Sequence, residues 1–190
     1  MENNKTTTKK GFTTRQIVLV GLMAAIVFLT NYISFKIPLI AGAPTRIHIA
    51  NGFCLLAGLT LGGLNGGLAA GIGSMLYDFT NPAYIASAPF TFLFKFLMSF
   101  IAGKTANLKD RQANDIKFNI LACVAGQVTY IVLYLGKKFI TGLLIGNAVE
   151  TVITTCLTSL FASTVNAVIA IVIAMVLLPV FKMTIKRINK

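Results

Sequence analysis

Charged side chains inside or beside apolar sequence are the residues of this chain that could do chemistry. Lys95 lies at the centre of FTFLFKFLM, Asp78 follows a Gly-rich apolar stretch, and Glu150 precedes the last apolar run. A charge inside a bilayer is costly and requires an opposite charge, water or a polar cavity. Lys95 therefore either forms a structural ion pair with Asp78 or Glu150, or belongs to a pair that lines a polar cavity. The sequence leaves both alternatives open, and all three residues are candidate substrate ligands.

A stripe of polar and aromatic side chains repeats with helical spacing further along the chain. Gln127, Tyr130 and Tyr134 follow one another at i, i+3 and i+7, which places them on one face of a helix. A membrane interface would explain Tyr134 alone, whereas a cavity that stacks and hydrogen-bonds a ring would explain all three. Asn166, in FASTVNAVIA, is an amide that either binds a neighbouring helix or holds a ligand. Tyr84, in the loop DFTNPAYIAS, is a further candidate for substrate binding.

Enzyme chemistry and metal binding find little support in the composition. The 190 residues include only five acidic residues and one histidine, which leaves little for general acid–base catalysis. The three cysteines show no CxxC or Cys/His spacing, so we expect no metal site. The stretch AGKT at 102–105 lacks the first glycine of a phosphate-binding loop. We therefore predict that the chain is not an enzyme, has no cofactor and has no ATP site of its own.

The overall composition predicts that these polar residues lie within a membrane protein. Hydrophobic residues make up 56% of the chain and charged residues 12%, and the mean hydropathy is +0.80. Long apolar runs with few charges are typical of membrane proteins, so the lipid bilayer is an expected partner. The net charge of +12 is concentrated at the ends of apolar runs instead of in one basic patch. This distribution argues against nucleic acid as a partner.

The apolar runs predict an all-α integral membrane protein with six transmembrane helices. The expected helices cover residues 16–35, 50–64, 66–77, 89–106, 116–135 and 160–181. Prolines and glycines predict loops at 36–48 and 78–87. The stretch 137–159 is ambiguous, so the last helix is expected to begin between 148 and 162. The expected organisation is a cytoplasmic tail at 1–15, one membrane domain at 16–182 and a second cytoplasmic tail at 183–190.

The distribution of basic residues predicts the orientation of the chain. With the N-terminus inside, the inner segments contain 12 basic residues, whereas the outer loops contain four, namely Lys36, Arg46, Lys137 and Lys138. Basic residues concentrate on the cytoplasmic side of membrane proteins. We therefore expect both termini in the cytoplasm.

Glycine is concentrated in the two short expected helices, at LAGLTLGGLNGGLAAGIG. Each glycine inside a helix costs about 1 kcal/mol relative to alanine. Close packing of helix backbones accounts for most of this cost. The alternative is that the small residues form a surface that must slide or turn.

Several motifs in order resemble one transporter family. FKIPL, the Gly-rich segments after it, APFTFLFKFLMSFIAGKTA and TVNAVIAIVIA are similar to the substrate-binding S components of energy-coupling factor (ECF) vitamin transporters. The resemblance covers roughly residues 15–185, and its nearest branch is the riboflavin-type family, which includes members assigned to vitamin B6 or hydroxymethylpyrimidine. It implies a multi-pass protein of the bacterial plasma membrane that holds a vitamin near the outer face. A lid from the first loop is implied, and its expected residues here are Arg46, His48 and Asn51.

The resemblance also implies partners. An S component docks on a membrane coupling subunit driven by two cytoplasmic ATPases, through small residues of its first helix, and Gly21, Ala24 and Ala25 match that feature. The chain contains no tryptophan to stack a substrate ring. We expect a pyridoxine-like vitamin or a pyrimidine precursor ahead of riboflavin. The sequence does not decide which vitamin is bound, or whether the coupling module is dedicated or shared.

The alternative class is a self-contained secondary transporter or channel for a small molecule. Such a protein would need an ion-coupling site and an inverted repeat, and neither is evident in the sequence.

Overall fold

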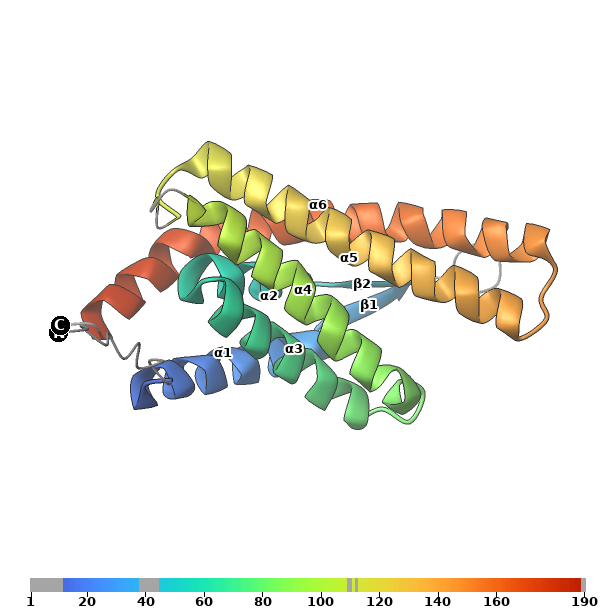
Figure 1. Cartoon of the computed structure of the whole chain (residues 1–190), viewed down its shortest axis with the longest axis horizontal. Coiled ribbons are helices and arrows are strands. Elements are labelled where there is room, and N and C mark those ends of the chain that lie inside the picture. Colours follow the sequence, from blue (N-terminus) through green and yellow to red (C-terminus); the bar gives the residue numbers. More distant parts are fainter. Residues whose placement is uncertain (1–11, 38–44, 109–110, 112, 189–190) are drawn as a thin grey trace, which may run out of the picture.

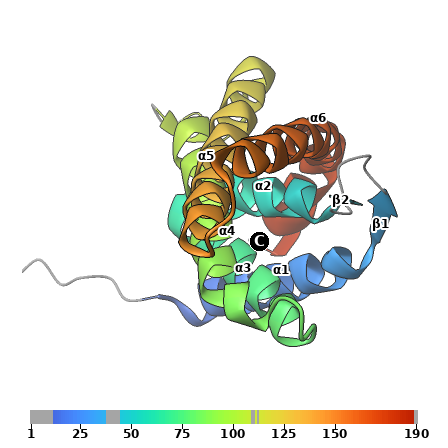
Figure 2. The ribbon, with the colours of Figure 1, turned by 90° about the vertical axis from the view of Figure 1, so that its right-hand side faces the viewer.

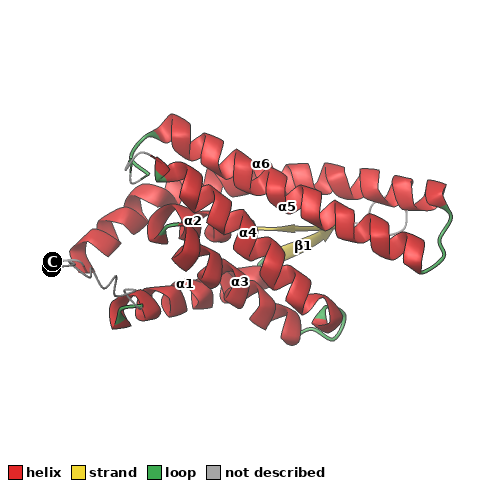
Figure 3. Cartoon of the chain, in the orientation of Figure 1, coloured by secondary structure: helices red, strands yellow, loops and turns green. Residues whose placement is uncertain are grey.

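A computed structural model describes residues 12–37, 45–108, 111 and 113–188. Helices make up almost all of this part of the chain, and the two strands form one short antiparallel ribbon (Figure 3). The elements are α1 (Thr14–Tyr32), β1 (Ser34–Ile37), β2 (Thr45–His48), α2 (Ala50–Leu61), α3 (Gly63–Phe79), the 3₁₀ turn η1 (Ile85–Ser87), α4 (Ala88–Ala106), α5 (Ile116–Leu144) and α6 (Val149–Ile188). The expected tails at 1–15 and 183–190 lie partly outside the described residues.

Four helical segments are long and apolar enough to cross a membrane. They are α1, η1 together with α4, α5, and most of α6. The helices α2 and α3 are shorter, with 12 and 17 residues. A span of the hydrocarbon core requires about 20 helical residues. The nearly all-helical fold with several apolar helices fits a multi-pass membrane protein.

The short helix α2 lies at the centre of the bundle, and the short helix α3 packs beside it. The helix α3 packs against α1 and α4, while α2 packs against α3, α4 and α6 (Figures 1 and 2). A Cβ atom at Gly58 of α2 would collide with the carbonyl oxygen of Ser99 in α4, and one at Gly73 of α3 would collide with that of Ala24 in α1. Since these neighbours are backbone atoms, they cannot move aside. The glycines therefore allow helix axes to approach more closely than side chains would permit.

Polar side chains and glycines set the ends of the helices. Thr13 and Gln16 form a reciprocal capping box at the start of α1, and the Asp115 carboxylate accepts backbone N–H bonds at the start of α5. Such caps satisfy donors that have no partner inside the helix. Gly62 separates α2 from α3 with a φ of 83°, a left-handed conformation that favours glycine.

The segment predicted as the first loop contains parts of two strands, which its prolines and glycines did not predict. Strand β1 pairs with β2 so that Phe35 lies opposite Ile47. The prediction of an unstructured loop over 36–48 was therefore wrong at both of its ends. The sequence SFKI alternates polar and apolar residues, which is the pattern of a strand. Pairing also gives the backbone groups of both strands partners where no helix does so. The residues between the strands, 38–44, lie outside the described part of the chain.

The ambiguous segment 137–159 belongs to two long helices. The helix α5 continues nine residues beyond the expected end at 135 and stops at Leu144, while α6 begins at Val149. The expectation that Lys137 and Lys138 lie in an outer loop was wrong. The connection consists of residues 145–148, where Gly146 adopts a φ of 85°. Gly142 lies inside α5 without interrupting it. It faces Val152 of α6 across the tight connection.

Candidate functional site

A cavity of about 640 Å³ lies at one end of the bundle. Its walls come from α4, α5 and α6, with contributions from α1, β2, α2, α3 and the α3–α4 connection. The start of α1 and the end of α6 lie at the opposite end, together with the end of α4 and the start of α5 (Figure 1). The cavity thus gathers residues that are more than 130 positions apart in sequence, from Asn31 to Asn166.

Lys95 is buried at the cavity wall and is held by two groups. Its ammonium Nζ donates a hydrogen bond to Oδ1 of Asn51, and the same atom lies 4.0 Å from the centre of the Tyr130 ring. A cation over an aromatic face is attracted by the negative face of the ring. Asn51 is the second residue of α2 and is 2% exposed, so its assignment to the lid loop was wrong. Its amide instead positions the lysine.

The aromatic part of the stripe on α5 lines the cavity. The rings of Tyr130 and Tyr134 are stacked, with centroids 5.9 Å apart and planes inclined by 8°. Such a pair presents a flat aromatic surface on which a planar ligand can stack. Gln127, one turn earlier, is 2% exposed and does not line the cavity. Neither atom of its amide has a hydrogen-bond partner within the described structure.

Asn166 connects the cavity to the β ribbon. It lines the cavity from α6, and its Oδ1 accepts a 3.0 Å hydrogen bond from the backbone N–H of His48. His48 ends strand β2 and also lines the cavity. The amide therefore fixes the inner end of the ribbon against α6. The backbone of Arg46 belongs to β2, whereas its side chain is outside the described structure.

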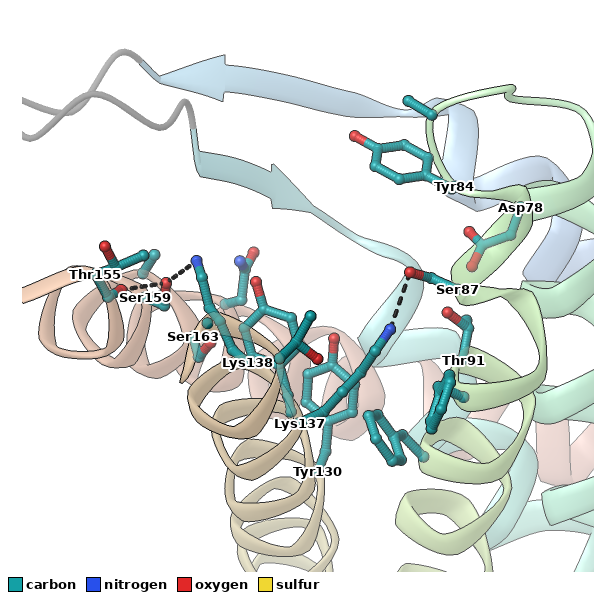
Figure 4. A pocket seen from close by; sticks show the side chains of 18 of the residues that line it. Asp78, Tyr84, Ser87, Thr91, Tyr130, Lys137, Lys138, Thr155, Ser159 and Ser163 are labelled. Atoms are coloured by element: carbon teal, nitrogen blue, oxygen red, sulfur yellow. Dashed lines mark hydrogen bonds between the residues drawn. The ribbon is translucent and has the colours of Figure 1, made fainter. Parts of the chain in front are cut away.

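The acidic candidates divide into one that lines the cavity and one that does not. Asp78, 8% exposed near the end of α3, and Tyr84 in the following connection both line it (Figure 4). Glu150 is exposed in the first turn of α6 and is not among the lining residues. The structure therefore brings Asp78 to the site and leaves Glu150 outside it.

Two lysines and a row of hydroxyl groups were missed by the sequence analysis. Lys137 Nζ donates to Oγ of Ser87 at 2.9 Å, and Lys138 Nζ donates to Oγ of Ser159 at 2.5 Å (Figure 4). The sequence pattern that could have revealed the two lysines is their position three and four residues after Tyr134, which continues the stripe on α5. The hydroxyl row on α6 has the same kind of signal, because its members recur every four residues. They are Thr151, Thr155, Ser159 and Ser163.

The three expected docking residues on α1 do not share one environment. Gly21 and Ala25 are exposed, and a Cβ atom at Gly21 would meet nothing within 4 Å. Ala24 is 6% exposed and packs against Gly73 of α3. Gly21 and Ala25 therefore remain available to another molecule, while Ala24 belongs to the contact between α1 and α3.

The cavity can bind a small molecule by stacking, hydrogen bonding and charge. Its volume lies within the range of about 300–1,000 Å³ that is typical of small-molecule sites. The fold and the cavity together define a class, a multi-pass helical membrane protein with a ligand-sized polar and aromatic cavity at one end.

Comparisons with known proteins identify the family. The model of the ECF-type riboflavin transporter S component family matches residues 11–183, and the chain belongs to that family. It is a family of transporter components and not of enzymes. A solved structure described as the S component of a bacterial ECF transporter has a TM-score of 0.62 to this chain, with 20% sequence identity. The match covers 93% of this chain and 98% of that chain, and it shows a shared fold. No match was found among curated proteins.

Proposed function

We propose that the chain captures a planar heteroaromatic vitamin in this cavity and delivers it to an ECF-type importer. The observation that carries the proposal is the stacked pair of Tyr130 and Tyr134 beside the Lys95 ammonium. A flat ring can stack on the tyrosines while its polar edge meets Lys95 and Asn51. This arrangement supplies an aromatic surface and directed hydrogen bonds without tryptophan.

The family and the cavity volume favour riboflavin as the first vitamin to test. The family model is that of riboflavin transporter components, and a cavity of about 640 Å³ is generous for a single pyridine or pyrimidine ring. This reverses the order expected from the sequence, which placed a pyridoxine-like vitamin or a pyrimidine precursor first. These smaller vitamins are the second candidates.

The proposed membrane arrangement embeds all six α-helices, with α2 and α3 enclosed by the longer ones. Both termini and the α4–α5 connection face the cytoplasm of a bacterial cell, and the cavity faces outward. The support is the excess of basic residues in the sequence before α1, between α4 and α5 and at the end of α6. In this arrangement His48 and Arg46 belong to a ribbon over the vitamin site, which is the proposed lid.

The proposed partners are a membrane coupling subunit and two cytoplasmic ATPases. The exposed face of α1 combines Gly21 and Ala25 with apolar side chains that include Val18 and Leu22, which are 62% and 57% exposed. Small residues between larger apolar ones permit close approach of another helix. We therefore assign this face to the coupling subunit.

Titration calorimetry on the purified full chain tests the proposed function. Riboflavin, pyridoxine and 4-amino-5-hydroxymethyl-2-methylpyrimidine are compared, and Tyr130→Ala is the matched variant. We expect saturable binding of one vitamin and a clear loss of affinity in Tyr130→Ala. Uptake into vesicles that contain only this chain, driven by a proton gradient, would instead support the secondary transporter.

A further inference from the structure

The cavity contains more positive than negative charge. Lys95, Lys137 and Lys138 line it, and Asp78 is the only acidic residue among the described lining residues. Asp78 can neutralise one of the three ammonium groups. Two positive charges then remain at a site that is partly enclosed by protein.

The rest of the chain offers little negative charge to balance them. It has five acidic residues in total. Asp115 caps the start of α5, at the far end of that helix from the cavity. Glu150 is exposed and does not line the cavity. The remaining two, Glu2 and Asp110, lie outside the described residues.

The hydrogen-bond and ring partners described for the two lysines on α5 are neutral, and Asp78 acts on Lys137 through its charge. Lys137 donates to Ser87 and Lys138 donates to Ser159. Figure 4 shows that the two side chains reach from α5 toward opposite walls, one formed by η1 and α4 and the other by α6. A serine hydroxyl orients an ammonium group without neutralising it. Each ammonium has three N–H donors and uses one of them in these bonds, whereas the Ser159 hydroxyl already donates to the Thr155 carbonyl. The two ammonium groups therefore have donors left for a ligand.

An anionic oxygen matches this donor set. Hydrogen bonds between an ammonium group and a phosphate or carboxylate are shorter and stronger than neutral ones. They gain further strength where burial excludes water, because the effective dielectric constant is lower than in bulk solvent. A neutral ligand would leave both ammonium groups partly desolvated and uncompensated.

We propose that the ligand of this cavity carries an anionic group, a phosphate ester or a carboxylate, attached to its planar ring. Lys137 and Lys138 bind that group, while the stacked tyrosines and Lys95 bind the ring. The inference rests on the proposed function, since it assumes that the cavity is the vitamin site. It narrows the preferred ligand to charged forms, which should bind more tightly than neutral riboflavin or pyridoxine.

Matched ligand pairs test the charge separately from the ring. The full chain, in nanodiscs of phosphatidylcholine, is titrated with riboflavin and flavin mononucleotide. It is then titrated with pyridoxine, pyridoxine 5′-phosphate and 4-pyridoxic acid. The phosphate of pyridoxine is used instead of that of pyridoxal, because an aldehyde would react with lysine amines. Pyridoxine 5′-phosphate and 4-pyridoxic acid distinguish a phosphate from a carboxylate on the same ring.

One of the two series, flavin or pyridoxine, should bind. Within that series we expect the charged ligand to bind at least about tenfold more tightly than its neutral partner. The preference should weaken as salt increases. The double variant Lys137→Met/Lys138→Met should lose the preference, so that the charged and the neutral member bind it about equally. Lys137→Arg/Lys138→Arg should retain the preference. The control, Lys117→Met/Lys186→Met, removes two exposed lysines at the other end of the bundle and should change nothing.

Three results would overturn the inference. The first is a neutral ligand that binds as tightly as its charged partner, and this result leaves the proposed vitamin capture intact. The second is a preference that survives in Lys137→Met/Lys138→Met. The third is loss of the preference in nanodiscs of phosphatidylglycerol, which would assign the two lysines to a lipid headgroup. Absence of binding by every ligand would overturn the inference and the proposed function together.

Discussion

At the scale of single residues, Lys95 is a buried charge with a structural role and a proposed role in binding. Its ammonium group is bonded to Asn51 and lies over Tyr130, so it joins α2, α4 and α5 at the cavity. The sequence offered an ion pair and a cavity residue as alternatives. Lys95 lines the cavity and also connects three helices, so its structural role and its proposed role in binding can be separated by mutation.

Replacement of Lys95 by methionine should weaken vitamin binding and lower thermal stability. Loss of a hydrogen bond from a charged donor costs about 1.5–3 kcal/mol, which corresponds to roughly a 10- to 150-fold loss of affinity. The stability loss arises because the Asn51 amide is left buried without its donor. The measurements are calorimetric affinity and the thermal unfolding midpoint of the purified chain.

The double variant Lys95→Met/Asn51→Leu provides the control. Removal of both partners leaves no unsatisfied amide, so stability should recover while binding stays weak. A double variant that also binds normally would show that Lys95 does not contact the vitamin.

Asn166 is expected to control release more than capture. Its amide holds the end of strand β2 through the His48 N–H, so Asn166→Ala should loosen the ribbon over the cavity. The loss of one hydrogen bond in a buried site costs about 1–3 kcal/mol, or roughly 5- to 150-fold, and most of it should appear as faster dissociation. Stopped-flow binding measures the two rates. Asn166→Asp keeps an acceptor oxygen and should dissociate more slowly than Asn166→Ala; equal rates would contradict the role assigned to the bond.

At the scale of the elements, the sequence predicted the helices well where apolar runs were long and clean. The expected helix at 89–106 closely matches α4, and the expected start of α5 at 116 is the observed one. The errors came from polar residues that the structure turns inward. Lys137 and Lys138 looked like a loop because a lysine pair rarely lies inside a membrane helix. Their serine partners, which come from η1 and α6, cannot be recognised without the fold.

The candidate site was predictable to the extent that its residues followed a helical face. Tyr130 and Tyr134 were found in this way, whereas Lys95 and Asn166 were found as isolated polar residues within apolar sequence. Asn51 was misplaced, because its role depends on the contact between α2 and α4. Gln127 matched the spacing but does not line the cavity. Helical spacing predicts the face on which a residue lies, but it does not predict how far a cavity extends along that face.

Two glycine substitutions, one at the contact between α2 and α4 and one on the exposed surface of α5, should have different effects on stability. Gly58→Ala should lower the thermal midpoint, because its Cβ would collide with backbone at Ser99, and overpacking costs typically about 1–3 kcal/mol. Gly136→Ala is the matched control in α5, where a Cβ would meet nothing within 4 Å. It should be neutral or stabilising by up to about 1 kcal/mol, since alanine favours helix. Thermal unfolding of both variants measures the difference, and similar midpoints would show that the approach of α2 to α4 can relax.

At the scale of the whole molecule, the proposed vitamin site and the proposed docking face lie mainly on different elements. The cavity is built mainly from α4, α5 and α6, whereas the exposed small residues belong to α1. The two functions proposed for the chain should therefore be separable. A change on α1 can block delivery without an effect on capture.

The double variant Gly21→Leu/Ala25→Leu tests this separation. Two leucines on the exposed face of α1 would hold a partner helix away, because close approach depends on small residues. We expect co-purification with the coupling subunit and ATP-dependent uptake to fall at least about tenfold, which corresponds to a loss of roughly 1.4 kcal/mol. Vitamin affinity of the isolated chain should be unchanged. Val172→Phe is the control, since Val172 is 56% exposed on α6 and a larger apolar residue there should leave uptake intact. Normal uptake by the double variant would exclude Gly21 and Ala25 from the docking surface, and weakened vitamin binding would show that capture and docking are coupled through the bundle.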